Sequence, residues 1–560
     1  MVMNNSTNGP YVDARLVSSL EKGLVNGRTE DYPALTQISV LKGERLNFQL
    51  FLRVAPYENR RRRLFNVETS GIDTAAYEVR QVYADYPCFN VDRSREDGLY
   101  IDSTTGLYPD VLEPLDDGSR LRPLEDTLTA VWFETEISQA GEYAVTVTVK
   151  EEGETVAQLP LSVTVIDAQL PEQSLICTQW FHNDCLASYY NVPVFSEEHW
   201  RIIGNYMRFA VRHGINCILT PIFTPPLDTE IGSERPTVQL VGVTRTAGKY
   251  CFDFTLLKRY LDLAKSCGVR YYEISHLFSQ WGAEFAPKVV AVVDGTLQRI
   301  FGWDTPGTEG EYPRFLKAFL PELTDFLRRE GVMERCRFHV SDEPGEQHLE
   351  RYLKAKQIVA PYLPEEAVMD AMSSVEFYRR GIIRTPVPSS NHIEPFLEED
   401  IKERWTYYCC SQFDKVANRF IAYPAFRNRI LGVQLYKYRI DGFLQWGYNF
   451  YYSMGSRRLI NPYLSQSGER QVPSGDTFSV YPGAAGQPVA STRLAVFHEA
   501  VQDIDALKLC ESLVGRDKVV ALIDSLAGRP VTFADYPKSA DYLLRLRAEV
   551  NALIAKAIAG

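Results

Sequence analysis

The sequence predicts an all-β and α/β chain: an N-terminal antiparallel β-sandwich, then a (β/α)8 TIM barrel, then a C-terminal helical extension. Three observations lead to this fold class. Short alternating apolar runs fill residues 1–167, strand and helix patterns alternate eight times over residues 168–512, and residues 513–560 are helical. At 560 residues the chain is too long for one hydrophobic core, which agrees with several domains.

Period-2 alternation defines the first part. The clearest segments are 36–41, 46–52, 127–133, 141–149 and 161–165, and turns rich in Gly and Pro separate them. Many short strands at regular spacing are typical of an antiparallel sandwich. No catalytic constellation appears here, so we expect this domain to support the next one.

Alternating strands and helices define the second part, and eight such units favour a barrel over an open doubly wound sheet. The expected strands are 175–180, 216–220, 269–275, 337–341, 367–372, 385–388, 405–410 and 442–446, and the helices after them are 200–213, 256–266, 314–329, 349–360, 375–380, 395–404, 419–438 and 492–510. Long connections at 221–250, 277–311 and 447–490 lie on the face where a barrel places its site, and loops of that length are normally functional or disordered.

Composition excludes several classes of function. A net charge of -12 argues against nucleic acid or an anionic membrane as partner, and no apolar run reaches the ~18 residues of a membrane span. Ten scattered cysteines form no CxxC pair and no zinc-type spacing, so we expect no metal and a reducing, cytoplasmic location. The first residues lack the basic and apolar regions of a signal peptide.

The segment 336–344 stands out because an alternating strand ends in two adjacent carboxylates, Asp342 and Glu343, followed by Pro344. A helix pattern with acidic residues opens directly afterwards. Carboxylates at the C-terminal end of a barrel strand are placed for catalysis. The alternative is that Asp342 caps the helix and Glu343 forms a surface salt bridge.

Other strand ends contribute polar and aromatic side chains to the same rim. Since Arg and Lys are scarce there, a neutral polyhydroxylated ligand fits better than a phosphate, and we expect no cofactor. Trp446 and Tyr448 are candidates for stacking on a sugar ring, and His276, Asn391 and Tyr481 for binding its hydroxyls. The full set of predicted substrate-binding residues is Trp180, His182, His276, Asn391, Tyr408, Trp446, Tyr448 and Tyr481.

Glycosidic cleavage needs a protonated carboxylic acid beside the leaving oxygen and a group that stabilises the oxocarbenium-like centre. Adjacent carboxylates can raise one another's pKa. In a regular strand Asp342 and Glu343 would point to opposite faces, so the chain must bend there. Neighbours in sequence rarely straddle a sugar at the ~5 Å of a direct retaining pair. An Asp-Glu dyad fits better where a 2-acetamido group of the substrate is the nucleophile.

His339 followed by 341–344 (SDEP) resembles the catalytic signature of glycoside hydrolase family 123, the β-N-acetylgalactosaminidases. Segments 475–483, 491–494 and 502–503 are similar to the DUF4091 region of that family, 442–446 to its eighth strand and 43–50 to its sandwich. The chain departs from the family pattern at Ala495, where an acid is expected, and in its Tyr-rich segment after the eighth strand.

The resemblance implies a retaining exo-β-N-acetylgalactosaminidase that uses substrate-assisted catalysis on glycans with a terminal 2-acetamido sugar. Glu343 would be the acid/base, and Asp342 would orient the acetamido group. Two alternatives stay open: a retaining glycosidase whose nucleophile comes from another strand, and a non-catalytic carbohydrate-binding protein. A Glu at the end of strand four suits the first, although strand seven offers Tyr407 and Tyr408 in place of a second Glu.

Overall fold

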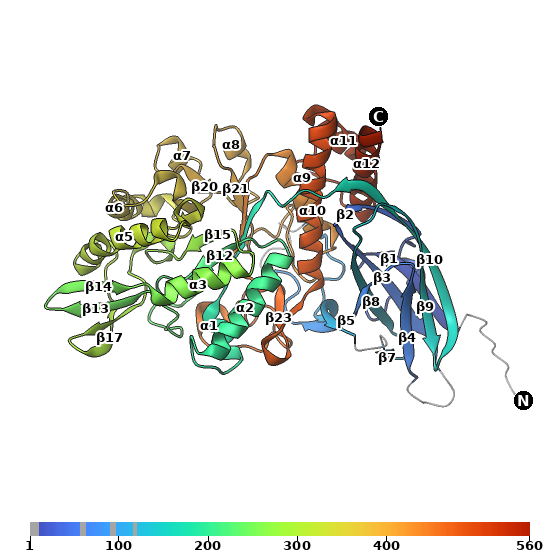
Figure 1. Ribbon diagram of the computed structural model, residues 1–560, viewed down its shortest axis with the longest axis horizontal. Helices are drawn as coiled ribbons and strands as arrows, with labels where there is room; N and C mark the ends of the chain where they lie inside the picture. Colours follow the sequence, from blue (N-terminus) through green and yellow to red (C-terminus); the bar gives the residue numbers. More distant parts are fainter. Residues whose placement is uncertain (1–10, 57–62, 90–96, 116–119, 560) are drawn as a thin grey trace, which may run out of the picture.

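The computed structural model describes residues 11–56, 63–89, 97–115 and 120–559 (Figure 1). The first residues, from which the lack of a signal peptide was inferred, lie outside this range. Two five-stranded sheets form the N-terminal part. In spatial order, one contains β1 (Val12–Ser18), β3 (Arg45–Val54), β8 (Leu128–Glu136), β5 (Ala75–Ala84) and β6 (Gly106–Pro114), and the other β2 (Gln37–Lys42), β10 (Glu154–Gln169), β9 (Gly141–Glu151), β4 (Phe65–Ser70) and β7 (Arg120–Leu121).

The two sheets share one hydrophobic core. Phe48 of β3 and Phe133 of β8 stack at 4.9 Å, and they belong to the same buried cluster as Val147 of β9 and Val163 of β10. The five predicted strands are confirmed, and five more are present. One pairing differs from the expected antiparallel arrangement: β2 and β10 run parallel, which is possible because a long connection and not a hairpin joins them.

All eight predicted strands of the second part are present. They are β11 (Ile176–Gln179), β12 (Cys217–Thr220), β15 (Tyr271–Ile274), β18 (Cys336–Phe338), β19 (Met369–Ala371), β20 (Thr385–Val387), β21 (Trp405–Tyr407) and β22 (Gly442–Gln445). Six form a parallel sheet in the order β18-β15-β12-β11-β22-β21, and β19 pairs with β20. Single parallel bridges join Phe338 to Val368 and Ser389 to Tyr407.

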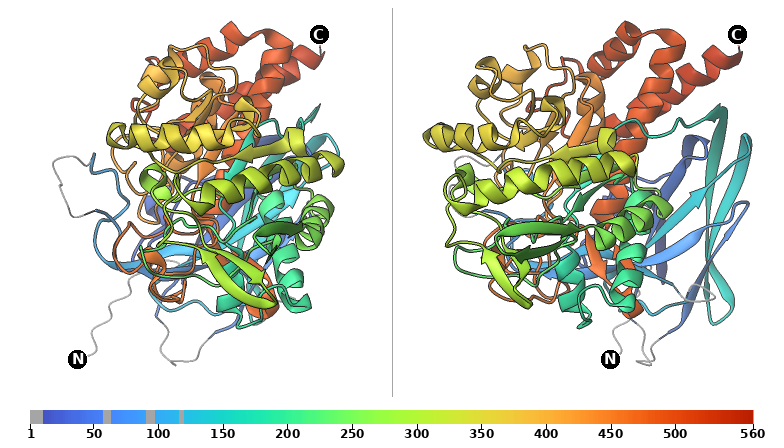
Figure 2. Two further views of the ribbon diagram at one scale, coloured as in Figure 1. Left: turned by 90° about the vertical axis from the view of Figure 1, so that its left-hand side faces the viewer. Right: turned by 60° about the vertical axis from the view of Figure 1, so that its left-hand side comes forward.

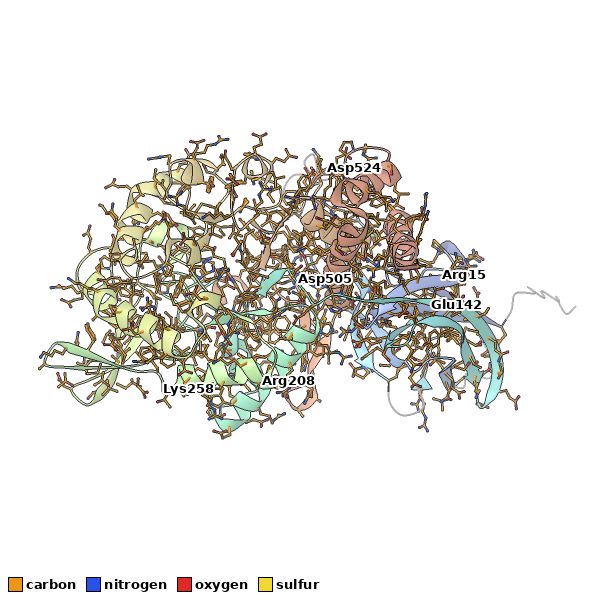
Figure 3. The ribbon with its side chains drawn as sticks, turned by 45° about the horizontal axis from the view of Figure 1, so that its top comes forward. Arg15, Glu142, Arg208, Lys258, Asp505 and Asp524 are labelled. Atoms are coloured by element: carbon orange, nitrogen blue, oxygen red, sulfur yellow. The ribbon has the colours of Figure 1, made fainter. Side chains whose placement is uncertain are left out.

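A helix follows each of these strands before the next begins. They are α2 (Glu197–Arg212), α3 (Thr255–Ser266), α5 (Glu311–Arg329), α6 (Leu349–Val359), α7 (Glu376–Arg379), α8 (Glu394–Leu397), α9 (Phe426–Lys437) and α10 (Thr492–Val514). Charged residues such as Arg208 on α2 and Lys258 on α3 lie on the outer side of these helices (Figure 3). Helix α9 begins later than predicted because the buried guanidinium of Arg419 bonds to Gln179 and holds its segment out of the helix.

Two of the long connections, 221–250 and 277–311, supply most of a four-stranded sheet that extends away from the parallel strands (Figure 1). It is made of β14 (Lys249–Asp253), β13 (Gly242–Thr246), β16 (Val289–Val293) and β17 (Thr296–Phe301). The remaining short elements are α1 (Asn183–Tyr189), α4 (Gln280–Ala283), β23 (Val480–Pro482), β24 (Pro488–Ala490) and the 3-10 turns η1 (Thr29–Asp31), η2 (Met333–Arg335), η3 (Glu346–His348), η4 (Glu365–Ala367), η5 (Met454–Ser456) and η6 (Ala484–Gly486).

The chain ends in α11 (Arg516–Ala527) and α12 (Ala540–Ala559). Figure 2 shows these helices beside the sandwich, and Asn551 of α12 donates to the Ser39 carbonyl of β2 at 2.9 Å. The expected domain boundaries at residues 167 and 512 stay predictions. Strand β10 continues past the first, to Gln169, and helix α10 past the second, to Val514. No helix in the described part of the chain is long and apolar enough to cross a membrane.

A buried ion pair joins the sandwich to the second part. The Arg493 guanidinium of α10 makes two bonds of 2.9 Å to the Asp110 carboxylate of β6, and both side chains are at most 1% exposed. Tyr481 donates to the same carboxylate at 2.6 Å. Loss of either partner would leave an unpaired charge in the interior, which is costly. The pair therefore stabilises the packing of the sandwich against the second part.

We expect Asp110→Asn to lower the free energy of unfolding by roughly 3–5 kcal/mol, because it leaves Arg493 as an unpaired buried charge. Urea denaturation followed by circular dichroism measures the change. The control is Glu311→Gln, which breaks a pair with Arg314 whose side chains are 57% and 70% exposed. That change should cost about 1 kcal/mol or less. Equal denaturation midpoints for the two variants would contradict the prediction.

Candidate active site

The chain bends where Asp342 and Glu343 follow β18. The strand ends at Phe338, and Glu343 has a φ of 45°, in the left-handed region. Such a conformation costs a non-glycine residue energy and is common at functional sites. The bend breaks the alternation of a strand, so the two neighbouring carboxyl groups no longer have to face opposite sides. The side chain of Asp342 is buried, and that of Glu343 is exposed.

Gln280 holds Asp342 in place. Its Nε2 donates to Asp342 Oδ2 at 3.0 Å, while its Oε1 accepts from the backbone N–H of Asp228, also at 3.0 Å. The backbone N–H of Trp281 donates to the Asp342 carbonyl at 2.8 Å. Burial raises the pKa of Asp342 well above its usual value, and the charge of Glu343 raises it further. Asp342 therefore retains a proton more readily than an ordinary aspartate.

Tyr407 binds the second carboxylate. Its hydroxyl donates to Glu343 Oε1 at 2.5 Å, from a side chain that is 6% exposed. Burial, then the negative charge of Glu343, raises the pKa of Tyr407 well above 10, so the phenol stays a donor. The backbone N–H of Glu343 donates to the Ala371 carbonyl at 3.1 Å. Contacts from β19 and β21, the strands on either side of β20, thus fix the orientation of Glu343.

A buried histidine between two carboxylates lies next to the pair. His339 Nε2 donates to Glu273 Oε1 at 2.7 Å, and Nδ1 lies 3.4 Å from Asp370 Oδ1. Burial opposes the charged form, but hydrogen bonds and attraction to both carboxylates outweigh it and raise the pKa of His339 to about 10. The resulting imidazolium also lowers the pKa of Asp342, against the larger effect of burial.

The same network fixes the backbone that leads to Asp342. Asp370 accepts from the backbone N–H groups of Val340 and Ser341 at 3.0 and 3.3 Å, and from the Tyr352 hydroxyl at 2.6 Å. Glu273 accepts from Trp180 Nε1 at 2.7 Å. Side chains of four strands and of α6 therefore converge under the carboxylate pair.

His276, one of the predicted substrate-binding residues, has free hydrogen-bonding capacity. Its ring stacks on His339, with centroids 4.1 Å apart and an angle of 12°, and the Trp180 ring meets it edge-on at 5.3 Å. Burial and the neighbouring imidazolium lower its pKa well below 6.5, so it is neutral. Neither ring nitrogen has a partner among the described residues, although the side chain is fully buried. Such an atom costs free energy unless a ligand or water satisfies it.

Two further carboxylates lie near the pair: Asp228 acts on Asp342, and Asp476 acts on Asp228. Asp476, from the loop after β22, accepts from Trp446 Nε1 at 2.9 Å, and burial raises its pKa to about 6. Asp228 follows β12, and burial, with Glu343 and Asp476 also contributing, raises its pKa to about 7. Carboxyl groups that gather beyond strand ends and raise one another's pKa, as Glu343 and Asp228 raise that of Asp342, are typical of a catalytic site.

The structure does not bring every predicted ligand to the carboxylates. Tyr408, Tyr448 and Tyr481 are fully buried, and the last two donate to the Tyr206 carbonyl and to Asp110. His182 lies between the Trp446 carbonyl and Arg235, and burial lowers its pKa to about 3.

Asn391, by contrast, is exposed and accepts from Gln412 at 3.0 Å.

Sequence reasoning chose Tyr408, but its neighbour Tyr407 contacts Glu343. Successive residues of a strand point to opposite faces, so only one of Tyr407 and Tyr408 could face the carboxylates. The alternation of β21 therefore indicated a choice between the two. Asp228 and Gln280 were missed because they lie in long connections, where no period relates residue number to direction. No group of three or more His, Cys, Asp or Glu side chains within the described ranges is arranged to hold a metal ion.

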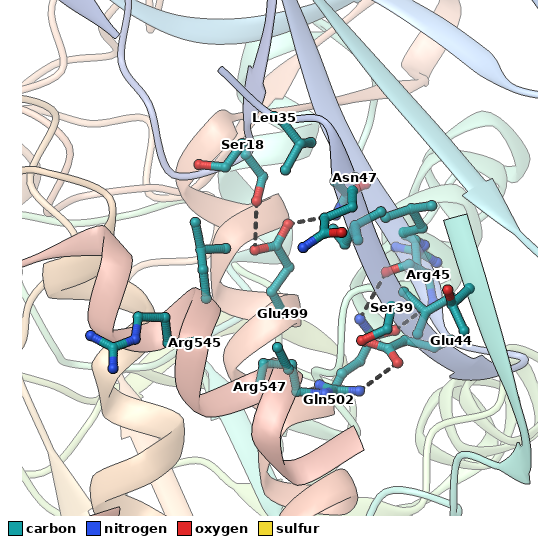
Figure 4. Close-up of a pocket in the computed structure, with 18 of the residues that line it drawn as sticks. Ser18, Leu35, Ser39, Glu44, Arg45, Asn47, Glu499, Gln502, Arg545 and Arg547 are labelled. Carbon is teal, nitrogen blue, oxygen red and sulfur yellow. Dashed lines mark hydrogen bonds and ion pairs between the residues drawn. The ribbon is translucent and has the colours of Figure 1, made fainter. Parts of the chain in front are cut away.

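A cavity of about 450 Å³ lies elsewhere, between β2 and β3 of the sandwich and helices α10 and α12 (Figure 4). Its acidic groups are already paired: Glu499 accepts from Arg429 at 2.8 Å, and Arg547 binds both Asp503 and Glu44. Because internal ion pairs satisfy these charges, we assign this cavity to the packing of the two parts.

His339 predicts a pH dependence of stability. Its pKa is about 10 in the folded protein and ~6.5 when unfolded, so its contribution is complete below pH ~6.5 and is lost as the pH rises through about 10. We expect the free energy of unfolding to fall between pH 7 and 10, and to fall less in His339→Gln. Urea denaturation at several pH values measures both slopes. His392→Gln, at an exposed histidine, should keep the wild-type slope, and equal slopes in all three proteins would contradict the prediction.

Comparison with solved structures gives a match over the whole chain. A family 123 glycoside hydrolase from Clostridium perfringens superposes with a TM-score of 0.72 at 15% sequence identity, covering 98% of each chain. A family 39 glycoside hydrolase from Bacteroides cellulosilyticus WH2 aligns with a TM-score of only 0.31 at 9% identity, covering 86% of this chain and 82% of that one. No curated protein matches the sequence significantly.

The family comparison covers the region that carries the carboxylates. The family model described as "Glycoside hydrolase 123, catalytic domain" matches residues 180–510, which include β12 to β22, the long connections and most of α10. This match extends over more than half of the chain, and the Clostridium perfringens enzyme has the same fold. The chain therefore belongs to glycoside hydrolase family 123.

Proposed function

We propose that this glycoside hydrolase is a retaining exo-β-N-acetylhexosaminidase, preferentially an N-acetylgalactosaminidase, that works by substrate-assisted catalysis. The observation that carries the proposal is the different environment of two adjacent carboxyl groups. Asp342 is buried and bonded to Gln280, whereas Glu343 is exposed and bonded to Tyr407. Groups with such different surroundings can take the separate roles of stabilising a cation and transferring a proton.

In this mechanism Glu343 protonates the glycosidic oxygen while the acetamido carbonyl oxygen of the substrate attacks the anomeric carbon. The C–O bond to the leaving group breaks, and an oxazolinium ion forms. Asp342 accepts a hydrogen bond from the acetamido N–H and balances the positive charge. Glu343 then takes a proton from the water that attacks the anomeric carbon and opens the oxazolinium ring. Because both displacements occur at the anomeric carbon, its configuration is retained overall.

The two carboxyl groups share one proton in the active form. Burial and the charge of Glu343 raise the pKa of Asp342, which favours the proton on Asp342 before the substrate binds. A substrate N–H that donates to Asp342 favours its ionised form, so the proton moves to Glu343 as the sugar binds. Titration then belongs to the pair and not to either residue alone.

We further infer that the eight parallel strands close into a barrel. The bridges from Phe338 to Val368 and from Ser389 to Tyr407 support this, because they would join the β19–β20 pair to both edges of the six-stranded sheet. A closed barrel would place all eight strand ends around one opening.

One alternative keeps a specific observation in its favour. Asp228 and Asp476 come from the loops after β12 and β22; the charge of Glu343 acts on Asp228, and Asp476 acts on Asp228 in turn. Either could serve as the nucleophile of an ordinary retaining glycosidase, which would not need an acetamido group on the substrate. The Clostridium perfringens protein, by its description, hydrolyses glycolipid glycans, and such a glycan would suit both mechanisms.

Chromogenic substrates separate these mechanisms. We expect hydrolysis of the aryl β-N-acetylgalactosaminide and at least ~100-fold slower hydrolysis of the plain galactoside and glucoside, which lack the internal nucleophile. Release of the aryl group is followed by absorbance. Comparable rates on the plain galactoside would favour Asp228 or Asp476 as nucleophile, and sugar binding without any product would indicate a non-catalytic protein.

Variants of the pair test the two roles. Glu343→Gln should lose ~10²–10⁴ in rate on a natural glycan and less on an aryl substrate, whose leaving group needs little protonation. Asp342→Asn should slow both substrates alike, because acetamido attack precedes departure of either group. The control is Glu350→Gln on α6, at a side chain that is 87% exposed, and it should match wild type. Near-wild-type activity of Glu343→Gln on both substrates would show that the site lies elsewhere.

A further inference from the structure

Trp281 is an exposed tryptophan beside the carboxylate pair. Its side chain is 57% exposed, whereas Trp132, Trp180, Trp405 and Trp446 are at most 8% exposed. Among the described residues no aromatic ring or cation stacks on the indole. A large apolar ring left in water costs free energy that burial against a ligand would recover.

The backbone holds Trp281 at the end of β18. Its N–H donates to the Asp342 carbonyl at 2.8 Å, and the N–H groups of Gly282 and Ala283 donate to Ser341 Oγ at 3.3 and 3.2 Å. The preceding side chain, Gln280, bonds to the Asp342 carboxylate. Any movement of the indole is thus restricted by the residues that also fix the carboxylate.

This arrangement is strained. Trp281, Gly282 and Ala283 have φ values of 55°, 99° and 61°, three consecutive residues in the left-handed region. A Cβ on Gly282 would lie 2.4 Å from the Cβ of His348, so no other residue fits there. Non-glycine residues in this conformation persist only where surrounding bonds enforce it, and such strain gathers at ligand-binding positions.

We propose that Trp281 is the platform on which the sugar of the leaving group stacks, immediately beyond the bond that is cleaved. The inference rests on the proposed function and deepens it. Asp342 is buried and binds the acetamido group of the terminal sugar, whereas Glu343 reaches the glycosidic oxygen from the exposed side. The exposed indole of Trp281, whose backbone N–H bonds to the Asp342 carbonyl, then lies on the side from which the leaving-group sugar extends.

The surroundings of the ring favour a hexopyranose over a lipid chain. The segment around it is polar: Gln280 and Glu284 lie on the same short helix or at its end, His348 lies against Gly282, and Arg351 of α6 pairs with Glu284 at 2.8 Å. A sugar has one apolar face for the indole and hydroxyls for such polar neighbours. An acyl chain would need a continuous apolar surface instead.

The test compares two substrates that differ only in the leaving group. One is N-acetyl-β-galactosaminyl fluoride, which has no leaving-group ring, and the other is a β-N-acetylgalactosaminyl-galactose disaccharide. We expect Trp281→Ala to lower kcat/KM about tenfold on the disaccharide, through lost stacking, and to leave the fluoride within about twofold of wild type. Trp281→Phe should recover most of the loss. Leu297→Ala, at an apolar residue of β17 that is 68% exposed, should change neither rate.

Each contrary result has one meaning. An equal loss on both substrates would show that Trp281 only positions Asp342. No loss on the disaccharide would show that the indole does not stack on the leaving-group sugar. Either result overturns the inference and leaves the proposed function intact. A loss confined to octyl β-N-acetylgalactosaminide would overturn it in favour of a lipid aglycone. If wild type cleaves neither substrate, the proposed function fails and the platform with it.

Discussion

The buried imidazolium of His339 is the interaction on which the site depends. It lies between Glu273 on β15 and Asp370 on β19, the strands on either side of β18, and their negative charges keep it protonated despite complete burial. Removing the imidazolium would leave two buried carboxylates without a counter-charge, which is costly. Asp370 also accepts from the backbone of Val340 and Ser341. One ion network therefore joins adjacent strands and sets the path of the chain into Asp342.

The carboxylate pair combines this fixed path with strain. The left-handed backbone at Glu343 and at Trp281 is held by hydrogen bonds to Ala371 and Asp342, so the bend is enforced by contacts between strands and not by local preference. Asp342 is buried where its charged form is disfavoured, and Gln280 partly offsets that cost. Such a site is primed for a ligand that brings an N–H donor to Asp342 and hydrogen-bonding groups to the unpaired nitrogens of His276.

The fold was largely predictable from periodicity. The eight parallel strands and the five clearest sandwich strands follow from period-2 and buried apolar runs, because such patterns are local. The weaker strands β1, β4, β5, β6 and β7, and the sheet formed by two long connections, were not recognised as elements. The shorter extent of α9 was hidden as well, since the buried bonds of Arg419 that hold its segment out of the helix come from strands distant in sequence.

The sequence by itself determined which residues are candidates for chemistry: Asp342 and Glu343 at a strand end, preceded by His339, in a motif that marks the family. Tertiary structure alone decided how they differ. Burial of Asp342, the contact of Tyr407 with Glu343, and the roles of Asp228 and Gln280 all depend on which strands and loops meet at one opening. The physical reason is that pKa values and hydrogen bonds depend on distances between groups, and the groups that lie close together can be far apart in sequence, as Asp228 and Glu343 are at 115 positions.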